Sequence, residues 1–533
     1  MQRGWWIAAA MLLGAGCGDD LTGTGETDGA GTTGSTGTSM GTGDASSQGS
    51  STSSSTDDTT SGDSTAGAED SSGSSTSGAL TTLETTVTLY PQQPMVVDVT
   101  VSGDGPLPED LSLSHDSDDG VRVAVLEEGP DAVTFRLRGL APATDHALTV
   151  SAGELSEPVA FLSEAPLPGF IPAFDVNGAQ GGEGPYRMFD LIPFPDFTTS
   201  SLFVVDPQGR TRFHLGQASG ALPGPDSVFA AAQLRDDGSV LFVHDNAVII
   251  LDELGEEVLR LDDEDLGLTG LHHDVLELDS GNFMSIAYSF QTVDYPDVGP
   301  TLTAGDVIAE FTPQGEVVWQ WDSFDDLDPL YIVPPNDGSS VLPHPMTGEM
   351  AYDWTHANGI VLSPDGSSVM ISLRHQDQMV SIDRASATMQ WRLGPGGDLA
   401  LQSGEWFHHQ HSPQWQADGS LMLYDNGVGP AGPGRSRVVR YTLDLDAMEA
   451  TQVFVDDDVD TTSVFAGDAD VLPETGNILV MDSAIFAKEG VMPRMREIDP
   501  DASPMMVWEM TFEAGRFAYR ATANDRLVGE AAR

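Results

Sequence analysis

The chain has 533 residues, enough for more than one domain and a sizeable core. Its 22 basic and 83 acidic residues give a net charge of −61 at pH 7, which argues against nucleic acid and anionic lipid as partners. Cys17 is the only cysteine, so an internal disulfide is excluded.

The first 17 residues have the pattern of an export signal. Arg3 is followed by an apolar run at residues 5–13, and the small residues 14–16 precede Cys17. This order resembles a bacterial lipoprotein signal, in which the cysteine is lipidated; an ordinary cleaved signal peptide is the alternative. The apolar run is too short to span a membrane. We therefore expect an exported protein that is held at a bacterial membrane by a lipid anchor only, in the periplasm or at the cell surface.

Residues 18–79 consist almost entirely of Gly, Ser, Thr, Asp and Ala. Such a composition offers almost no apolar surface to bury, so this segment is predicted to be a disordered acidic linker. It would hold the folded part of the chain away from the membrane.

Residues 80–165 are predicted to form a small β-sandwich. Alternating apolar runs at residues 86–89, 96–101 and 121–125 are typical of short strands between polar turns. The stretch "VTFRLRGLAPATDHALTV" at residues 133–150 resembles the later strands of fibronectin type III domains. We interpret this domain as a spacer or as a surface for homodimer formation.

Residues 166–533 contain a repeated unit of a glycine turn, an apolar strand, a second strand ending in Asp, and a strand that often bears Trp. It is clearest in "DDGSVLFVHDNAVIILDELGEEVLRL" from Asp236 and "PDGSSVMISLRHQDQMVSIDRASATMQWRLG" from Pro364. Five clear units and a partial first one predict a six-bladed β-propeller. We expect a strand from residues 517–527 to complete the first blade.

Polar residues recur at one position of these repeats. His273, Asn358 and His411 each lie eight residues before the glycine of a turn, and His356 lies two residues before Asn358. Residues i and i+2 of a strand share a face. Because the repeats of a propeller surround a central axis, this register predicts a histidine-rich centre at the axis.

The residue types at this centre suit transfer of a tetrahedral anionic group. A neutral imidazole can act as a nucleophile, and a second imidazole can act as general acid or base near neutral pH. Arg374 lies in the same region and carries a planar cation that fits sulfate or phosphate oxygens. Its charge would stabilise negative charge that develops on those oxygens.

Four motifs, in order, carry a family resemblance. They are His-Asp before a Gly-Asn turn, Asp-Trp-x-His-x-Asn from Asp353, Arg-His-Gln from Arg374 followed by Ile-Asp and Trp-x-Leu-Gly, and Gln-His-x-x-Gln-Trp from Gln410 followed by Asp-Gly and Asp-Asn-Gly. Together they resemble the bacterial arylsulfate sulfotransferases. This family consists of six-bladed propellers preceded by a small β-domain.

The resemblance implies nucleotide-independent, ping-pong transfer of a sulfuryl group from a phenolic sulfate ester to a phenolic acceptor through a sulfated histidine. It implies no cofactor and no metal. His411 matches the nucleophile and Arg374 the sulfate-binding arginine. His356 and His273 match further catalytic histidines, and one of them would protonate the leaving phenolate and deprotonate the acceptor.

The resemblance also implies substrate-binding roles for Asn358 and His272, and a site hydroxyl from a late blade, for which Thr462 and Ser463 are the candidates. Two other functions remain open. The histidine-rich runs at residues 408–411 and 272–274 could hold the metal of a hydrolase or oxidase. Alternatively, the propeller could be a non-enzymatic binding module at the cell surface.

Overall fold

The computed structural model describes residues 80–117, 120–129, 131–163, 174–178, 186–195, 200–216, 229–332, 340–456 and 461–532. Cys17, the export signal and the linker at residues 18–79 lie outside the described residues. Within them, strands dominate, which confirms the all-β prediction. No helix in these described ranges is long and apolar enough to cross a membrane.

The N-terminal strands form two sheets around one core. The first sheet has the order β1 (Leu83–Leu89), β2 (Val96–Gly103), β5 (Ala132–Arg138) and β4 (Arg122–Glu128), and the second the order β3 (Ser112–His115), β6 (Asp145–Ala152) and β7 (Leu155–Leu162). Alternate residues of β2, such as Val97 and Val99, pack against Leu148 and Val150 of β6. This is a small β-sandwich, whereas its likeness to fibronectin type III domains and its exact limits stay predictions.

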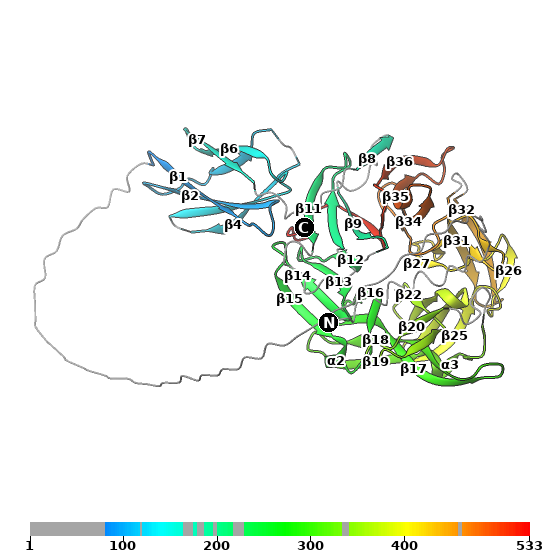
Figure 1. Ribbon diagram of the computed structural model, residues 1–533. Coiled ribbons are helices and arrows are strands. Elements are labelled where there is room, and N and C mark those ends of the chain that lie inside the picture. The colour runs from blue at the N-terminus through cyan, green and yellow to red at the C-terminus, as the bar shows by residue number, and fades with distance from the viewer. Residues whose placement is uncertain are drawn as a thin grey trace, which may run out of the picture. The chain divides into compact units, whose positions relative to one another are not determined.

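The described residues after this domain form sheets of four or more strands (Figure 1) and one two-stranded sheet of β29 (Val428–Gly429) and β30 (Gly432–Pro433). The first contains β9 (Tyr186–Pro193), β10 (Ser201–Val205) and β11 (Thr211–Gly216), and the second β12 (Ala230–Leu234), β13 (Val240–His244), β14 (Ala247–Leu251) and β15 (Glu257–Asp262). The third contains β16 (Leu271–Glu277), β17 (Phe283–Tyr295), β18 (Gly299–Phe311) and β19 (Val317–Asp322), with β20 (Val341–Pro343) and β21 (Met350–Asp353) added at its edge.

The later sheets repeat this order. The fourth contains β22 (Ala357–Leu362), β23 (Ser368–Leu373), β24 (Gln378–Asp383) and β25 (Thr388–Leu393), and the fifth β27 (His411–Trp415), β28 (Leu421–Asp425), β31 (Arg437–Asp444), β32 (Glu449–Val455) and β26 (Ala400–Ser403). The sixth contains β33 (Asp468–Val471), β34 (Ile478–Ala487), β35 (Gly490–Ile498), β36 (Met506–Thr511) and β8 (Asp175–Gly178).

The turn glycines explain the repeat. Gly281, Gly366 and Gly419 follow the first strand of their sheets with φ values of 80°, 68° and 81°, a conformation that side-chain-bearing residues rarely adopt. Each glycine therefore fixes the hairpin between the first and second strands. The strands between the turns are apolar on both faces, as in β13 and β14, because neighbouring sheets cover them.

The first strands of successive sheets form a ring. β12 contacts β16, β16 contacts β22, β22 contacts β27, and β27 contacts β33. β33 in turn contacts β38 (Ala521–Asn524), which pairs with β9, and β9 contacts β12. This closed ring is that of a β-propeller, and β38 together with β37 (Arg516–Phe517) completes the first blade as predicted. Residues 164–173, 179–185 and 217–228 lie outside the described residues, so the number of blades stays a prediction.

Candidate active site

One pocket collects side chains from several blades. It is lined by His273, His356, Arg374, His411, Phe465, Ala466 and Tyr519. His273 lies in β16 and His411 begins β27, while His356 directly precedes β22 and Arg374 directly follows β23. The structure therefore brings together the four residues that the sequence predicted as catalytic.

Irregular backbone at the start of the inner strands turns these side chains inward. The strand pairing shifts register between His272 and Val275 in β16, and between His411 and Gln414 in β27. His273 and His356 have φ values of 61° and 49°. Non-glycine residues in this left-handed region cost about 1–3 kcal/mol each and gather at functional sites. The pocket is thus built from bulges, which commonly re-aim side chains beside active sites.

The hydrogen bonds of His411 fix its tautomer. Its Nδ1 lies 2.6 Å from Oδ1 of Asn426 and 3.2 Å from the carbonyl oxygen of His409. Nδ2 of Asn426 donates to the carbonyls of Ser463 and Ala466, at 2.6 and 2.8 Å. Because the Asn426 amide uses its hydrogens on these carbonyls, its oxygen must accept, and Nδ1 of His411 must carry the proton. The free lone pair of His411 is therefore on Nε2.

Burial keeps His411 uncharged. Burial, together with the positive charge of Arg374, lowers the pKa of His411 well below its ordinary value. The ring is thus a neutral imidazole with an available Nε2, which is the form that a nucleophilic histidine needs.

His356 has a different partner. Its Nδ1 lies 2.6 Å from Oδ2 of Asp353, and the ring of His375 lies beside it at a centroid distance of 4.6 Å. Burial and then Arg374 lower the pKa of His356 to about 3, and burial raises the pKa of Asp353. A carboxylate at Nδ1 orients the ring and stabilises the imidazolium that forms when Nε2 takes up a proton.

His273 and His272 contact each other rather than facing the pocket together. Their Nδ1 atoms lie 2.7 Å apart. His272 stacks on Tyr288 at a centroid distance of 4.0 Å, and its Nε2 lies 3.1 Å from Oδ1 of Asp306 without hydrogen-bond geometry. Only His273 lines the pocket, where its ring lies 5.0 Å from that of His356. His272 therefore contacts His273 without lining the pocket itself.

Arg374 is available for an anion. Burial lowers its pKa to about 10, against the nearby carboxylates of Asp353 and Asp377, so it stays charged at neutral pH. Its Nη2 donates to the Val464 carbonyl at 3.4 Å, and within the described residues Arg374 forms no ion pair. Arg520, by contrast, is held by Asp274 through contacts of 2.8 and 2.9 Å.

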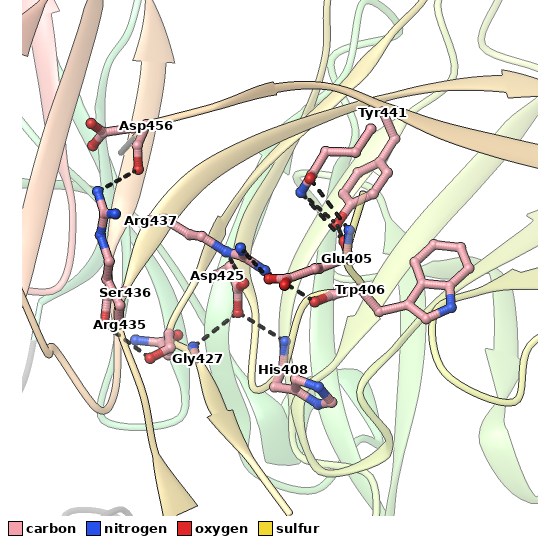
Figure 2. A network of polar contacts seen from close by, with 12 residues as sticks. Glu405, Trp406, His408, Asp425, Gly427, Arg435, Ser436, Arg437, Tyr441 and Asp456 are labelled. Carbon is pink, nitrogen blue, oxygen red and sulfur yellow. Dashed lines mark hydrogen bonds and ion pairs between the residues drawn. The ribbon is translucent and has the colours of Figure 1, made fainter. Parts of the chain in front are cut away.

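A polar network supports the segment that carries His411 (Figure 2). Asp425 accepts hydrogen bonds from the backbone N–H groups of His408 and Gly427 at 2.8 and 2.9 Å, and from Nε of Arg437 at 2.9 Å. Arg437 also binds Glu405 at 2.8 Å. The network joins the loop before His411 to the turn that carries Asn426, and so fixes the distance between these two residues.

Comparison with known proteins agrees with this geometry. The family model described as Arylsulfotransferase (ASST) matches residues 175–520, which include every residue that lines the pocket. The chain belongs to the arylsulfotransferase family. This membership supports aryl sulfotransferase activity in general. No curated protein matches the chain.

Several solved structures are similar to the chain at low identity. A protein of unknown function from Bacteroides caccae is 12% identical, with a TM-score of 0.38 over 61% of this chain and 94% of that chain. The Kuenenia stuttgartiensis hydrazine synthase is 11% identical, with a TM-score of 0.32 over 63% and 82%. The Pseudomonas aeruginosa periplasmic gluconolactonase is 14% identical, with a TM-score of 0.30 over 77% and 99%.

The residues predicted to bind substrate lie outside the lining of the arylsulfotransferase pocket. Nδ2 of Asn358 donates to the carbonyl of Gln410 at 2.8 Å, so Asn358 holds the residue before His411. The hydroxyl of Thr462 donates to the Gly434 carbonyl at 2.9 Å, and that of Ser463 accepts from the Ala484 N–H at 2.9 Å. The structure thus does not bring Thr462 or Ser463 to the pocket; their segment reaches it at Phe465 and Ala466.

Five functional contacts were missed at the sequence level, namely those of Asp353, Asn426, Phe465, Ala466 and Tyr519. Asp353 and Asn426 lie inside quoted motifs, so their position beside the histidines was a usable signal. Phe465, Ala466 and Tyr519 lie in segments without a repeat register, and no pattern in the sequence marked them.

The groups that could hold a metal differ from those expected. Within the described residues, one group of three has ligand atoms within 4.8 Å of one another, formed by Asp353, His356 and His375. Nδ1 of His356 lies 2.6 Å from Oδ2 of Asp353, and Nδ1 of His375 lies 2.8 Å from the backbone carbonyl oxygen of Asp353. The histidine runs at residues 272–274 and 408–411 form no such group within the described residues.

Proposed function

We propose that this protein is an aryl-sulfate sulfotransferase that works by a ping-pong mechanism through a sulfated His411. Membership of the arylsulfotransferase family supports the general activity. The observation that carries the mechanism is the pairing of a neutral His411, whose Nε2 is free, with Arg374, a buried cation without an ion pair in the described residues. A nucleophile and an anion-binding cation in one pocket suit transfer of a sulfuryl group.

In the first half-reaction, Nε2 of His411 attacks sulfur. The N–S bond forms, the ester S–O bond breaks, and its electron pair leaves on the phenolate oxygen. Arg374 stabilises the charge on the remaining sulfuryl oxygens. His356 takes up a proton from solvent at Nε2 when the anionic ester binds beside it, because the added negative charge raises the affinity of the ring for a proton. The resulting imidazolium gives this proton to the phenolate.

In the second half-reaction, Nε2 of His356 takes the proton of the acceptor phenol. The phenol oxygen attacks sulfur, the N–S bond breaks, and the electron pair returns to Nε2 of His411. The contact of 2.6 Å between Nδ1 of His356 and Asp353 favours His356 over His273 as the general acid and base. Because Asn426 is neutral, Nδ1 keeps its proton, and the sulfated ring is cationic and leaves readily.

The test uses the full chain with 4-nitrophenyl sulfate and excess phenol in the presence of a chelator. We expect nitrophenolate release that needs phenol, formation of phenyl sulfate, and a sulfuryl adduct on the protein when phenol is left out. All three should be absent in His411→Ala and present in His344→Ala, a histidine outside the pocket.

Other outcomes would contradict the proposal. Release into water that the chelator abolishes would favour a metal hydrolase built on Asp353, His356 and His375. A folded protein that turns over no donor would favour the binding module.

We also propose that the chain is exported and lipid-anchored at Cys17, on the strength of the pattern at residues 1–17. Fractionation of cells that express the chain tests this: the protein should be in the membrane fraction, and Cys17→Ser should release it or leave it unprocessed. Equal membrane retention of both forms would contradict the anchor. Homodimer formation through the N-terminal β-sandwich remains part of this proposal, and sedimentation measures it directly.

A further inference from the structure

Two chemically different sets of residues line the pocket. His273, His356, His411 and Arg374 are called the polar wall, and Phe465, Ala466 and Tyr519 the apolar wall. An aryl sulfate has the same division, because an anionic sulfate is joined to a flat apolar ring. The polar wall is explained by the proposed chemistry, but the apolar wall has no role in it.

Phe465 belongs to a cluster of phenylalanine rings. Its ring centroid lies 5.3 Å from that of Phe517, 6.3 Å from that of Phe486 and 6.4 Å from that of Phe194. Phe194 and Phe486 are themselves 6.0 Å apart. These separations are those of edge-to-face and offset ring pairs, so the four rings pack as one aromatic cluster.

The cluster runs from the pocket to solvent. Phe517 and Phe465 are 1% and 4% exposed, Phe194 is half-buried, and Phe486 is 52% exposed. A large apolar side chain that packs on other rings but leaves half its surface in water is available to a ligand.

The strand that carries Phe486 explains its position. β33 begins at Asp468, opposite Met481 of β34, so residues 482–487 of β34 continue beyond the inner strand. There Ile485 pairs with Ser463, which lies two residues before Phe465. The end of β34 therefore stands beside the segment that lines the pocket.

We propose that Phe465, Phe194 and Phe486 form an aryl-binding platform that leads out of the pocket, and that Phe486 selects for phenols with more than one ring. With the sulfuryl group at Arg374 and His411, the first ring lies on Phe465, and only a second ring reaches Phe486. The proposal rests on the proposed function, since it names the part of the substrate that the apolar wall receives.

The kinetic test compares phenol and 2-naphthol as acceptors with 4-nitrophenyl sulfate as donor, using the full chain. Phe486→Ala should raise KM for 2-naphthol about threefold to tenfold, because one aromatic pair and its buried area are lost. KM for phenol and kcat should stay unchanged. Val453→Ala, which removes a similarly exposed apolar side chain (48%) from β32, is the matched control. An unchanged KM for 2-naphthol, or an equal rise for both acceptors, would overturn the platform.

A binding measurement separates this proposal from the proposed function. In His411→Ala, which has no nucleophile, the fluorescence of 2-naphthyl sulfate reports binding without turnover. We expect Phe486→Ala in that background to weaken binding of naphthyl sulfate more than binding of phenyl sulfate. One outcome is that the wild-type chain transfers no sulfuryl group while Phe486→Ala still weakens binding of naphthyl sulfate more than binding of phenyl sulfate. That result would contradict the proposed function but support the aryl-binding platform. If transfer occurs and the difference is absent, the platform alone fails.

Discussion

At the scale of single residues, the structure explains why His411 has an asparagine rather than a carboxylate at Nδ1. Asn426→Asp would place a negative charge 2.6 Å from the imidazole, in a site that is buried. An opposite charge at this distance raises the pKa of a histidine by about 1–3 units. The acidic limb of kcat/KM against pH should move upward by that amount, because protonated Nε2 cannot attack.

The pH profile with 4-nitrophenyl sulfate measures this shift. Asn426→Ser, which keeps a hydroxyl acceptor but adds no charge, is the control and should lower the rate without moving the limb. Thermal melting of both variants shows whether the fold is kept, since the introduced carboxylate would face the carbonyls of Ser463 and Ala466. An unmoved limb in a folded Asn426→Asp protein would mean that His411 is not the titrating nucleophile.

The same residues show what the sequence could predict about the site. His273 and His411 were found because each lies eight residues before a turn glycine, and His356 because it lies two residues before Asn358, which has the same position. Arg374 was found because it lies in a motif beside them. Thr462 and Ser463 were assigned without such a register, and the structure places their hydroxyls in backbone contacts. The positive φ values that aim the histidines inward have no sequence signature, because they arise from bulges between paired strands.

At the scale of elements, a buried ion cluster joins the two sheets beside His411. Arg496 of β35 is fully buried and contacts Asp482 of β34 at 2.8 Å and Asp456 at 2.5 Å. Burial alone would raise the pKa of Asp482, but Arg496 and Arg494 lower it to about 2. The hydroxyl of Tyr424 in β28 also donates to Asp482 at 2.8 Å, so the cluster spans two sheets.

Arg496→Met should therefore destabilise the fold strongly. Removing one partner of a buried pair leaves carboxylates without their cation, at a cost of about 3–5 kcal/mol. Arg210→Met is the control, because the Arg210 side chain is 51% exposed and its pair with Asp206 is worth about 1 kcal/mol or less. Urea unfolding at neutral pH measures both. If Arg496→Met lowers the free energy of unfolding no more than Arg210→Met does, the ion cluster does not stabilise the fold.

The strands of the propeller were easier to predict from the sequence than the contacts between their side chains. The alternation of turn, strand and Trp-bearing strand was enough for a propeller, and the incomplete first unit was enough to expect a closing strand, which is β38. The extension of β17, β18 and β34 beyond their inner partners was not predicted, since strand length is set there by pairing between neighbouring strands. Phe486 lies on one of these extensions, so the aryl platform was not visible in the repeat.

At the scale of the whole molecule, the negative net charge of the protein disfavours binding of an anionic substrate. The net charge of −61 repels a monoanionic aryl sulfate, whereas the attraction of Arg374 acts only inside the pocket. Salt screens exposed charges far more than buried ones, and the screening length falls from about 30 Å at 0.01 M to about 3 Å at 1 M. Raising the ionic strength should therefore remove the repulsion and leave the attraction.

KM for 4-nitrophenyl sulfate should consequently fall by about threefold or more between these ionic strengths, the order of effect that surface fields have on charged ligands. KM for the neutral acceptor phenol should not change with salt. The phenol KM, measured at the same ionic strengths, is therefore the control for an effect of salt on the folded protein. Initial rates at several donor concentrations measure the dependence. A KM for the donor that rises with salt would mean that a local positive field around Arg374 outweighs the acidic surface, and the donor would then be drawn to the pocket from solution.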